Sequence, residues 1–261
     1  MTIAAHPPLW LFDFDSTLAR LDPEVDWPTL RAEVRKILER AHAPRGITQK
    51  VPLRALAMYE DYRAYLERTP AARAGGAAAL ARVALLIEQF ELAGVDRAKP
   101  LAGACDLLRA IAALKLRIGI VTSNSSVTVM RWLSRYRVAE TVGFVVGRDS
   151  NLALKPSPAT LKRGLEIAGV RARDAIFVGD REDDLHAARR ARIRFVGVAA
   201  DRPARDRLVT AGASEIYSSP AALAIHLNLA AARQLGGARA SKPRARKSHS
   251  RKSIVRKSRA V

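Results

Sequence analysis

The sequence of 261 residues has very little cysteine and lacks the long apolar segments that membrane spans require. Its single cysteine, Cys105, excludes a disulfide bond within the chain, which is typical of proteins in a reducing cytoplasm. Because no run has the apolar length needed to cross a bilayer, the sequence predicts no transmembrane helix. The N-terminus lacks a basic region before its first apolar run, so we expect no signal peptide and predict a cytoplasmic protein.

Acidic and aromatic residues are missing from the C-terminal end of the chain. From Arg239 onward the sequence reads RASKPRARKSHSRKSIVRKSRAV, with ten Lys or Arg residues, and these are half of the net charge of +20. A segment so rich in charge and serine has too little apolar surface to bury. We therefore predict a disordered basic tail over residues 236–261.

Short apolar runs alternate with amphipathic helical patterns along much of the remaining chain. The runs cover residues 9–12, 116–122, 142–147, 175–180 and 194–199. Helical patterns, for example at 103–115 and 157–170, separate them. Apolar strands that alternate with helices are typical of a parallel sheet covered on both faces. The sequence predicts an α/β fold with a Rossmann-like parallel sheet as its core.

The stretch from residue 20 to 99 differs, because it has helical periodicity without a strand pattern. Apolar residues recur at helical spacing from Leu30 to Ala41, from Val51 to Tyr65, and from Leu80 to Ile87. We predict an all-helical cap domain over residues 20–99. It is inserted into an α/β core made of residues 1–19 and 100–235.

Polar residues that can carry chemistry follow the ends of the predicted strands. They are Asp13-Phe14-Asp15-Ser16-Thr17, Thr122-Ser123-Asn124, Lys155-Pro156 in NLALKPSP, and Asp180 with Asp184 in VGDREDD. Ligand sites of parallel sheets lie beyond the carboxyl ends of the strands. Two carboxylates one residue apart repel each other unless a cation offsets their charge, and Mg²⁺ prefers such oxygen ligands.

Together these groups are the parts that phosphoryl transfer on Mg²⁺ needs. A carboxylate can attack phosphorus to form an acyl phosphate, and a second one, two residues later, can protonate the leaving oxygen. A hydroxyl, backbone N–H groups and a lysine can neutralise the phosphoryl oxygens. Each motif alone is also explained by a turn, a helix cap or a solvated lysine. Their joint order at strand ends favours the catalytic interpretation.

The motif set resembles that of the haloacid dehalogenase superfamily, and within it the phosphoglycolate-phosphatase-like branch with a helical cap. FDFDSTL is similar to the first family motif, GIVTSNS to the second, LKPSPATL to the third and AIFVGDREDDLHAARRA to the fourth. The resemblance covers roughly residues 9–200 and implies a nucleophile, Asp13, and a general acid/base, Asp15. It also implies phosphate binding by Thr122, Ser123, Asn124 and Lys155, and a Mg²⁺ ion held by Asp13, the backbone carbonyl of Asp15, Asp180 and Asp184.

By this resemblance the protein is a Mg²⁺-dependent phosphatase that hydrolyses a small phosphate monoester through an aspartyl-phosphate intermediate. Phosphoglycolate is the family-level expectation for the substrate. A phosphomutase or a pyrophosphatase on the same core stays open as an alternative. A further alternative is a nucleic-acid-tethered protein that acts mainly through its basic tail, which would bind nucleic acid or another anionic surface without sequence specificity. The sequence predicts no oligomeric state.

Truncation before Arg239 tests whether the tail and the rest of the chain act independently. We expect the truncated protein to lose any retention on immobilised DNA at low salt, because it lacks ten positive charges. Its hydrolysis of phosphate esters should equal that of the full chain. Retention on DNA that survives the truncation at the same salt concentration would contradict the assignment of nucleic-acid binding to the tail.

Overall fold

A computed structural model of the protein describes residues 7–49, 51 and 54–227, and in this part of the chain six strands form one parallel sheet. The strands are β1 (Leu9–Phe12), β2 (Arg117–Val121), β3 (Phe144–Val146), β4 (Ala175–Gly179), β5 (Arg194–Val198) and β6 (Ile216–Tyr217). Their order is β3-β2-β1-β4-β5-β6, so the direction of winding reverses between β1 and β4. This order is that of a Rossmann-like sheet and confirms the predicted α/β fold.

The sheet is covered on both faces, which explains why its central strands are continuous apolar runs. Along β1, Trp10 and Phe12 point into one hydrophobic cluster, while Leu9 and Leu11 point into the other. Helices α5 (Ala104–Ala113) and α6 (Ser126–Arg135) pack on the first face. Helices α7 (Ala159–Ala168), α8 (Glu182–Ala191) and α9 (Arg202–Thr210) pack on the second face.

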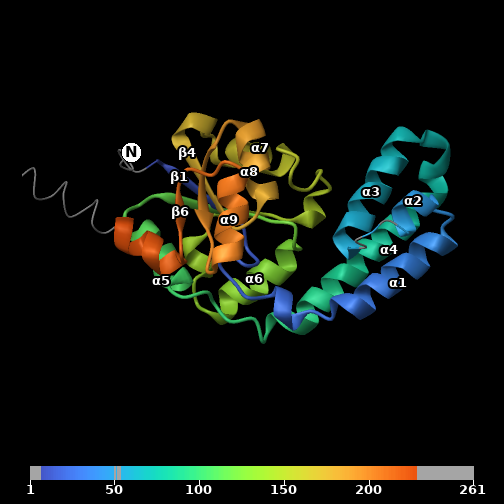
Figure 1. Ribbon diagram of the computed structural model, residues 1–261, viewed down its shortest axis with the longest axis horizontal. Helices are drawn as coiled ribbons and strands as arrows, with labels where there is room; N and C mark the ends of the chain where they lie inside the picture. The colour runs from blue at the N-terminus through green and yellow to red at the C-terminus, as the bar shows by residue number, and fades with distance from the viewer. Residues whose placement is uncertain (1–6, 50, 52–53, 228–261) are drawn as a thin grey trace, which may run out of the picture.

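Between β1 and α5 the described residues form a short 3-10 helix (Asp22–Glu24), four α-helices and no named strand. The α-helices are α1 (Trp27–Arg40), α2 (Arg45–Thr48), α3 (Ala55–Arg68) and α4 (Pro70–Val95). They lie together on one side of the sheet region (Figure 1). Their buried faces carry the predicted apolar residues, among them Leu30, Val34, Met58, Val83 and Ile87. The division into a cap of residues 20–99 and a core of residues 1–19 and 100–235 stays a prediction.

Three details of the sequence interpretation differ from the structure. Val51 is 90% exposed and precedes α3, so its assignment to the apolar face of that helix is wrong. The helix α2 was not predicted, because its four residues are too few to show a period. The strand β6 was not predicted either, since its two residues form no run.

The chain crosses between the sheet and the four helices through two segments that lie side by side. The backbone N–H of Arg20 donates to the carbonyl of Lys99 at 2.9 Å, and that of Leu101 donates to the carbonyl of Leu18 at 2.9 Å. One hydrophobic cluster runs continuously from the sheet through these segments into the helices. The helical insertion is thus joined to the sheet by backbone pairing as well as by packing.

No helix in the described ranges combines the length and the apolar character that crossing a membrane would require. The predicted basic tail, residues 236–261, lies outside the described residues.

Candidate active site

The first motif leaves the sheet at its carboxyl edge. The backbone N–H of Asp13 donates to the carbonyl of Val178 at 2.8 Å, which extends the pairing of β1 with β4 by one residue. The side chain of Asp15 turns toward the start of the insertion, where its Oδ1 accepts from the N–H groups of Leu21 at 2.9 Å and Asp22 at 3.0 Å. The two carboxylates of the motif are therefore aimed in different directions, which relieves the repulsion that the sequence implies.

Ser16, which follows Asp15, has a φ of 61° and so lies in the left-handed region. This backbone conformation favours glycine, although a serine can adopt it at a modest free-energy cost.

Three carboxylates converge where β1 and β4 end. Asp13, Asp180 and Asp184 each offer an oxygen within 4.8 Å of the others. The buried amine of Lys155 lies 2.6 Å from Oδ1 of Asp13 and 2.5 Å from Oδ1 of Asp184. The hydroxyl of Thr17 donates to Oδ1 of Asp180 at 3.2 Å. Oxygen ligands so close together suit a hard divalent cation.

The first turn of α8 fixes Asp184. Its Oδ2 accepts from the backbone N–H groups of Asp180 at 3.1 Å and Arg181 at 3.0 Å. A Cβ atom at Gly179 would lie 2.6 Å from this same oxygen, so the approach requires glycine at that position. Because α8 starts at Glu182, shortly after β4 ends at Gly179, Asp184 in its first turn lies close to Asp180 at the strand end.

Burial dominates the electrostatics of the cluster. Desolvation raises the pKa of Asp13, and repulsion from Asp184 raises it further. The attraction of Lys155 lowers this pKa but does not cancel the rise. Desolvation and the charges of Asp184 and Asp13 raise the pKa of Asp180 well above its ordinary value. Burial alone would lower the pKa of Lys155, but the attraction of Asp13 and Asp184 outweighs it and the pKa is raised. One ammonium group therefore offsets only part of the carboxylate charge.

Asp15 is not part of the carboxylate cluster, but its pKa is raised as well. Burial raises its pKa to about 7, with smaller opposing contributions from the N–H groups of Asp22 and Leu21. A carboxyl group that titrates near neutral pH is able both to donate and to accept a proton.

The loop after β2 holds the second motif. The backbone N–H of Thr122 donates to the carbonyl of Val146 at 3.0 Å, which continues the pairing of β2 with β3. The hydroxyl of Thr122 donates to Oδ1 of Asn124 at 3.1 Å and accepts from its N–H at 3.2 Å. Ser125 is the residue that caps α6, through the bond from Thr128 N–H to its hydroxyl at 3.2 Å. A simple capping role therefore does not account for Thr122 and Asn124.

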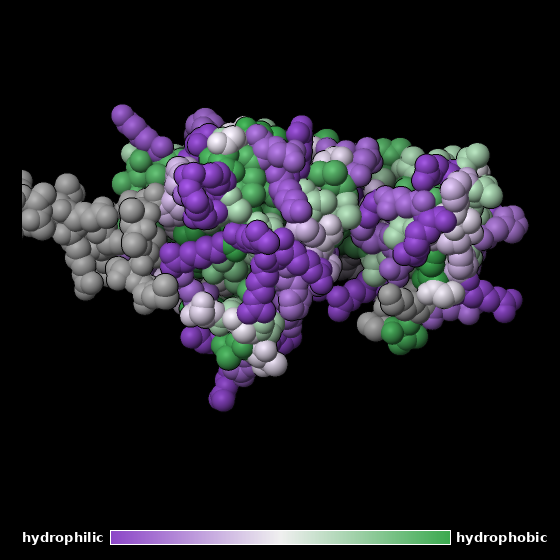
Figure 2. Space-filling model, turned by 90° about the horizontal axis from the view of Figure 1, so that it is seen from above, coloured by the Kyte–Doolittle hydropathy of each residue, from purple (hydrophilic) through white to green (hydrophobic). Residues whose placement is uncertain are grey.

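A cavity of about 660 Å³ lies between these strand ends and the helical insertion. Figure 2 shows hydrophilic residues around the notch between the two parts of the molecule. The cavity wall includes most of the predicted site, namely Asp13, Asp15, Thr122, Ser123, Asn124, Lys155 and Asp184. Asp180 lies in the carboxylate cluster beside it. The structure thus brings all the predicted site residues to one edge of the sheet, while their catalytic roles stay predictions.

The insertion contributes residues to this cavity that the sequence analysis did not select. The side chains of Trp27, Arg31 and Arg54 line it from the side opposite the sheet, and acidic residues such as Asp22 and Glu60 lie near them. Arginines that precede or lie within amphipathic helices have no local signature that separates them from surface residues, so only the fold identifies them.

Two further residues behind the loop were also missed, Glu91 of α4 and Arg148. Both side chains are buried, and they form an ion pair of 2.8 Å. Each had a signal in the sequence. Glu91 is an acid on the buried face of its helix, four residues after Ile87, and Arg148 directly follows the end of a predicted strand.

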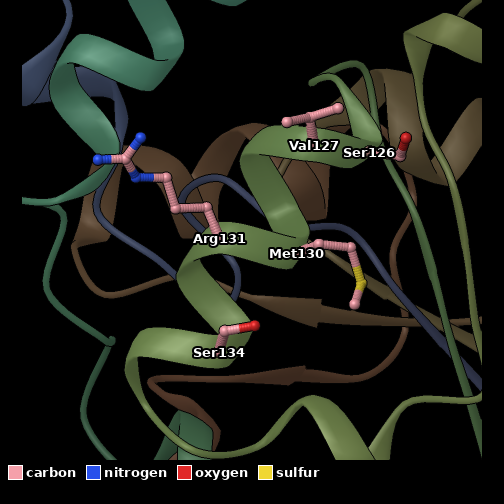
Figure 3. Close-up of a pocket in the computed structure, with 5 residues that line it drawn as sticks. All are labelled: Ser126, Val127, Met130, Arg131 and Ser134. Atoms are coloured by element: carbon pink, nitrogen blue, oxygen red, sulfur yellow. The ribbon is translucent and has the colours of Figure 1, made fainter.

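A second hollow lies on the outer side of α6, lined by Ser126, Val127, Met130, Arg131 and Ser134 (Figure 3). It contains none of the predicted site residues. Arg131 extends from it toward the end of α4, where it pairs with the carboxylate of Asp96, with Nε to Oδ1 at 2.8 Å. This side of α6 therefore has a structural link to the insertion but no grouping of catalytic side chains.

The unbalanced carboxylates predict that the metal-free protein is destabilised at neutral and alkaline pH. Because the pKa values of Asp13, Asp15 and Asp180 are raised in the folded state, folding takes up protons that the unfolded chain releases near its ordinary pKa of about 4. In EDTA the unfolding temperature should therefore fall as pH rises from 5 to 8. Mg²⁺ at about a hundred times its Kd should raise it by roughly 5–10 °C.

The variant Asp180→Asn provides the control for this experiment. Its amide oxygen can still accept from Thr17, while one repelling charge is gone. In EDTA at pH 8 it should unfold at a higher temperature than the wild type, with a weaker pH dependence and a smaller shift on addition of Mg²⁺. Thermal unfolding curves with equal pH and Mg²⁺ responses for both proteins would contradict the assignment of Asp180 to the cluster.

Comparison with known proteins gives a consistent result. The family model described as haloacid dehalogenase-like hydrolase matches residues 10–198. A phosphoglycolate phosphatase from Rhodospirillum rubrum is 29% identical over 223 residues, which cover 83% of this chain and 89% of that protein. A phosphoglycolate phosphatase from Pseudomonas putida is 27% identical, with coverage of 74% and 69%.

Solved structures show the same fold at low sequence identity. A hydrolase from Pseudomonas syringae has a TM-score of 0.58 at 22% identity. The superposition covers 84% of this chain and 97% of the chain of that hydrolase. CbbY from Rhodobacter sphaeroides, solved in complex with phosphate, has a TM-score of 0.56 at 17% identity, with coverage of 83% and 96%. Because the family model spans the sheet from β1 to β5 and all the predicted site residues, the chain belongs to the haloacid dehalogenase-like hydrolase family.

Proposed function

We propose that the protein is a Mg²⁺-dependent phosphatase that hydrolyses a small phosphate monoester through an aspartyl-phosphate intermediate. The observation that carries this proposal is the convergence of three carboxylates, from Asp13, Asp180 and Asp184, with the amine of Lys155 beside a cavity. Membership of the hydrolase family and the likeness to phosphoglycolate phosphatases over most of the chain support it.

The donor set fits Mg²⁺, because it consists of carboxylate oxygens within 4.8 Å of one another. Asp13, Asp180 and Asp184 would hold the ion, together with the backbone carbonyl of Asp15. When bound, the ion would offset the repulsion among these carboxylates and neutralise charge that develops on the phosphoryl group.

Asp13 supplies the nucleophile of the first step. One of its carboxylate oxygens forms a bond to phosphorus while the bond from phosphorus to the ester oxygen breaks. Asp15 donates its proton to the departing alkoxide. Lys155 and the hydroxyl of Thr122 bind phosphoryl oxygens during this transfer.

The second step releases the phosphoryl group to water. Asp15 takes a proton from a water molecule whose oxygen attacks phosphorus, and the bond between phosphorus and the oxygen of Asp13 breaks. Inorganic phosphate leaves and the carboxylate of Asp13 is restored. The cycle returns Asp15 to its protonated form, ready for the next ester.

A carboxylated ester such as phosphoglycolate suits the two arginines that the insertion contributes to the cavity. Arg31 and Arg54 line the cavity from the insertion, whereas Asp13 and Lys155 line it from the sheet edge. Guanidinium groups bind carboxylates well because their paired N–H donors match the two oxygens. Together with the activity named for the relatives, this makes phosphoglycolate the substrate that we propose.

Phosphate release from a panel of esters tests the reaction class. The panel contains phosphoglycolate, a sugar phosphate, a nucleoside monophosphate, p-nitrophenyl phosphate and pyrophosphate, each with Mg²⁺ and with EDTA. We expect release from phosphate monoesters that EDTA abolishes. Preferred release from pyrophosphate would favour the pyrophosphatase alternative, and transfer to a second hydroxyl in place of release would favour the phosphomutase.

Matched variants test the residues in the same assay. Asp13→Asn should lose activity by at least about three orders of magnitude, since an amide does not form the acyl phosphate. Asp184→Asn should also lose most activity, whereas Asp183→Asn, the neighbouring exposed acid, should retain most of it. A folded Asp13→Asn protein with substantial turnover would exclude Asp13 as the nucleophile.

The two arginines of the insertion give a test of substrate class. Replacement of both Arg31 and Arg54 by Met should raise KM for phosphoglycolate by about tenfold or more and leave KM for p-nitrophenyl phosphate within about twofold. Arg35→Met is the matched control, because Arg35 lies on the same helix as Arg31 and pairs with Glu39 outside the cavity. Equal effects on both esters would argue against recognition of the carboxylate.

A further inference from the structure

Behind the phosphate-binding loop, a carboxylate from the helical insertion is surrounded by hydrogen-bond donors. Glu91 of α4 has no exposed surface. Its two oxygens accept from Asn124 Nδ2 at 3.0 Å, the backbone N–H of Ser125 at 3.1 Å and the hydroxyl of Thr128 at 3.3 Å. They also accept from Arg148 Nη1 at 2.8 Å and Nη2 at 3.2 Å. A carboxylate bonded in this way is a rigid buried anchor.

Arg148 connects the same carboxylate to the rest of the loop. Its Nη1 donates to the carbonyl of Ser123 at 2.8 Å, and its backbone N–H donates to the carbonyl of Asn124 at 2.9 Å. Its neighbour Asp149 accepts from the backbone N–H of Ser126 at 2.7 Å. A Cβ at Gly147 would lie 2.8 Å from the carbonyl oxygen of Asn124, so glycine is what allows the end of β3 to approach this closely.

The bonds to Glu91 also fix the orientation of the side chains that face the cavity. Because Nδ2 of Asn124 donates to Glu91, Oδ1 of the same amide is turned toward Thr122, whose hydroxyl donates to it at 3.1 Å. A chain of hydrogen bonds therefore runs from the insertion to a residue of the cavity wall. Loss of the carboxylate would free the amide to rotate.

We propose that Glu91, acting with Arg148, is a positioning residue that holds residues 122–125 in the geometry that binds the phosphoryl group. The proposal rests on the proposed function, because it takes this loop to be the phosphate site. It assigns to α4 a part in phosphate binding, although no atom of Glu91 lines the cavity.

Inorganic phosphate is the probe that tests the proposal, since it binds through the loop without the need for a particular substrate. Its Kd is measured by calorimetry on the Mg²⁺-loaded full chain, well below the unfolding temperature of each variant. Glu91→Gln keeps the shape of the side chain but places an NH₂ group among N–H and O–H donors. We expect it to weaken phosphate binding by about tenfold or more and to lower kcat with it, while Kd for Mg²⁺ stays within about twofold.

A double variant separates positioning from stability. Glu91→Gln leaves the charge of Arg148 buried without its partner, so the unfolding temperature should fall. Adding Arg148→Met removes that charge and should restore much of the stability, but it also removes the bond to the Ser123 carbonyl. Phosphate binding should therefore remain weak. Recovery of phosphate affinity together with stability would overturn the proposal in favour of a purely structural ion pair.

Asp96→Asn is the matched control, because Asp96 is the C-cap residue of α4 and pairs with Arg131 of α6, outside residues 122–125. It should leave phosphate affinity and kcat within about twofold of the wild type. If Glu91→Gln does not fold, Arg148→Lys serves the same purpose, since lysine lacks the planar pair of nitrogens with which the guanidinium reaches both oxygens of Glu91 and the carbonyl of Ser123.

The outcomes distinguish this proposal from the function on which it rests. A wild-type protein that binds no phosphate with Mg²⁺ present would overturn the proposed function and the role of Glu91 with it. A wild type that binds phosphate, together with a folded Glu91→Gln protein of equal affinity, would overturn the role of Glu91 alone.

Discussion

Desolvation of like charges at one edge of the sheet is the constraint on which the candidate site depends. Parallel strands bring their carboxyl ends together, and the strand order makes β1 and β4 neighbours at the point where the winding reverses. Asp13 and Asp180 follow these two strands, and the helix after β4 adds Asp184. Burial and mutual repulsion raise the pKa values of Asp13 and Asp180, since Lys155 offsets only one of the charges. The fold stabilises this arrangement because β1 and β4, the strands that Asp13 and Asp180 follow, are buried along their whole length.

The helical insertion and the sheet are joined by side-chain packing and by backbone hydrogen bonds. One hydrophobic cluster extends from Trp10 of β1 to Leu30 of α1 and Ile87 of α4, and the two crossing segments pair through their backbones. The C-terminal end of α4, where Glu91 lies, is therefore fixed against the loop after β2, while Arg31 and Arg54 line the cavity from earlier segments of the insertion. This arrangement allows one insertion to serve two purposes. In the proposed function, its packed end holds the loop and its cavity side binds the part of the substrate that differs between esters.

The sequence predicted the parts of this site that depend on neighbouring residues. The apolar run 9–12 is the strand β1 without change, and Asp13, Thr122 and Asp180 each directly follow a strand, whereas Lys155 lies in the loop between β3 and α7 and not at a strand end. The residues that it did not predict depend on distant partners. Glu91 contacts Asn124, 33 residues away, and Arg148, 57 residues away, and no local period encodes either contact. Val51 was misassigned for the opposite reason, because a local apolar spacing continued into a segment that the packing leaves exposed.

Two buried charge clusters lie on either side of the loop at residues 122–125, and their balance of charge explains their different roles. The carboxylate cluster has three negative groups against the contacting amine of Lys155 and the nearby guanidinium of Arg181, so it keeps an excess of negative charge that a bound cation can offset. The pair of Glu91 and Arg148 is neutral, and both oxygens of Glu91 and both terminal nitrogens of Arg148 have hydrogen-bond partners within the protein. A buried cluster with an excess of negative charge binds a cation, because the protein alone does not neutralise that charge. A neutral cluster whose polar atoms are hydrogen-bonded holds its geometry whether or not a ligand is present. A loop between the two can be rigid on the side of α4 and reactive on the side of the cavity, which is the combination that phosphoryl transfer requires.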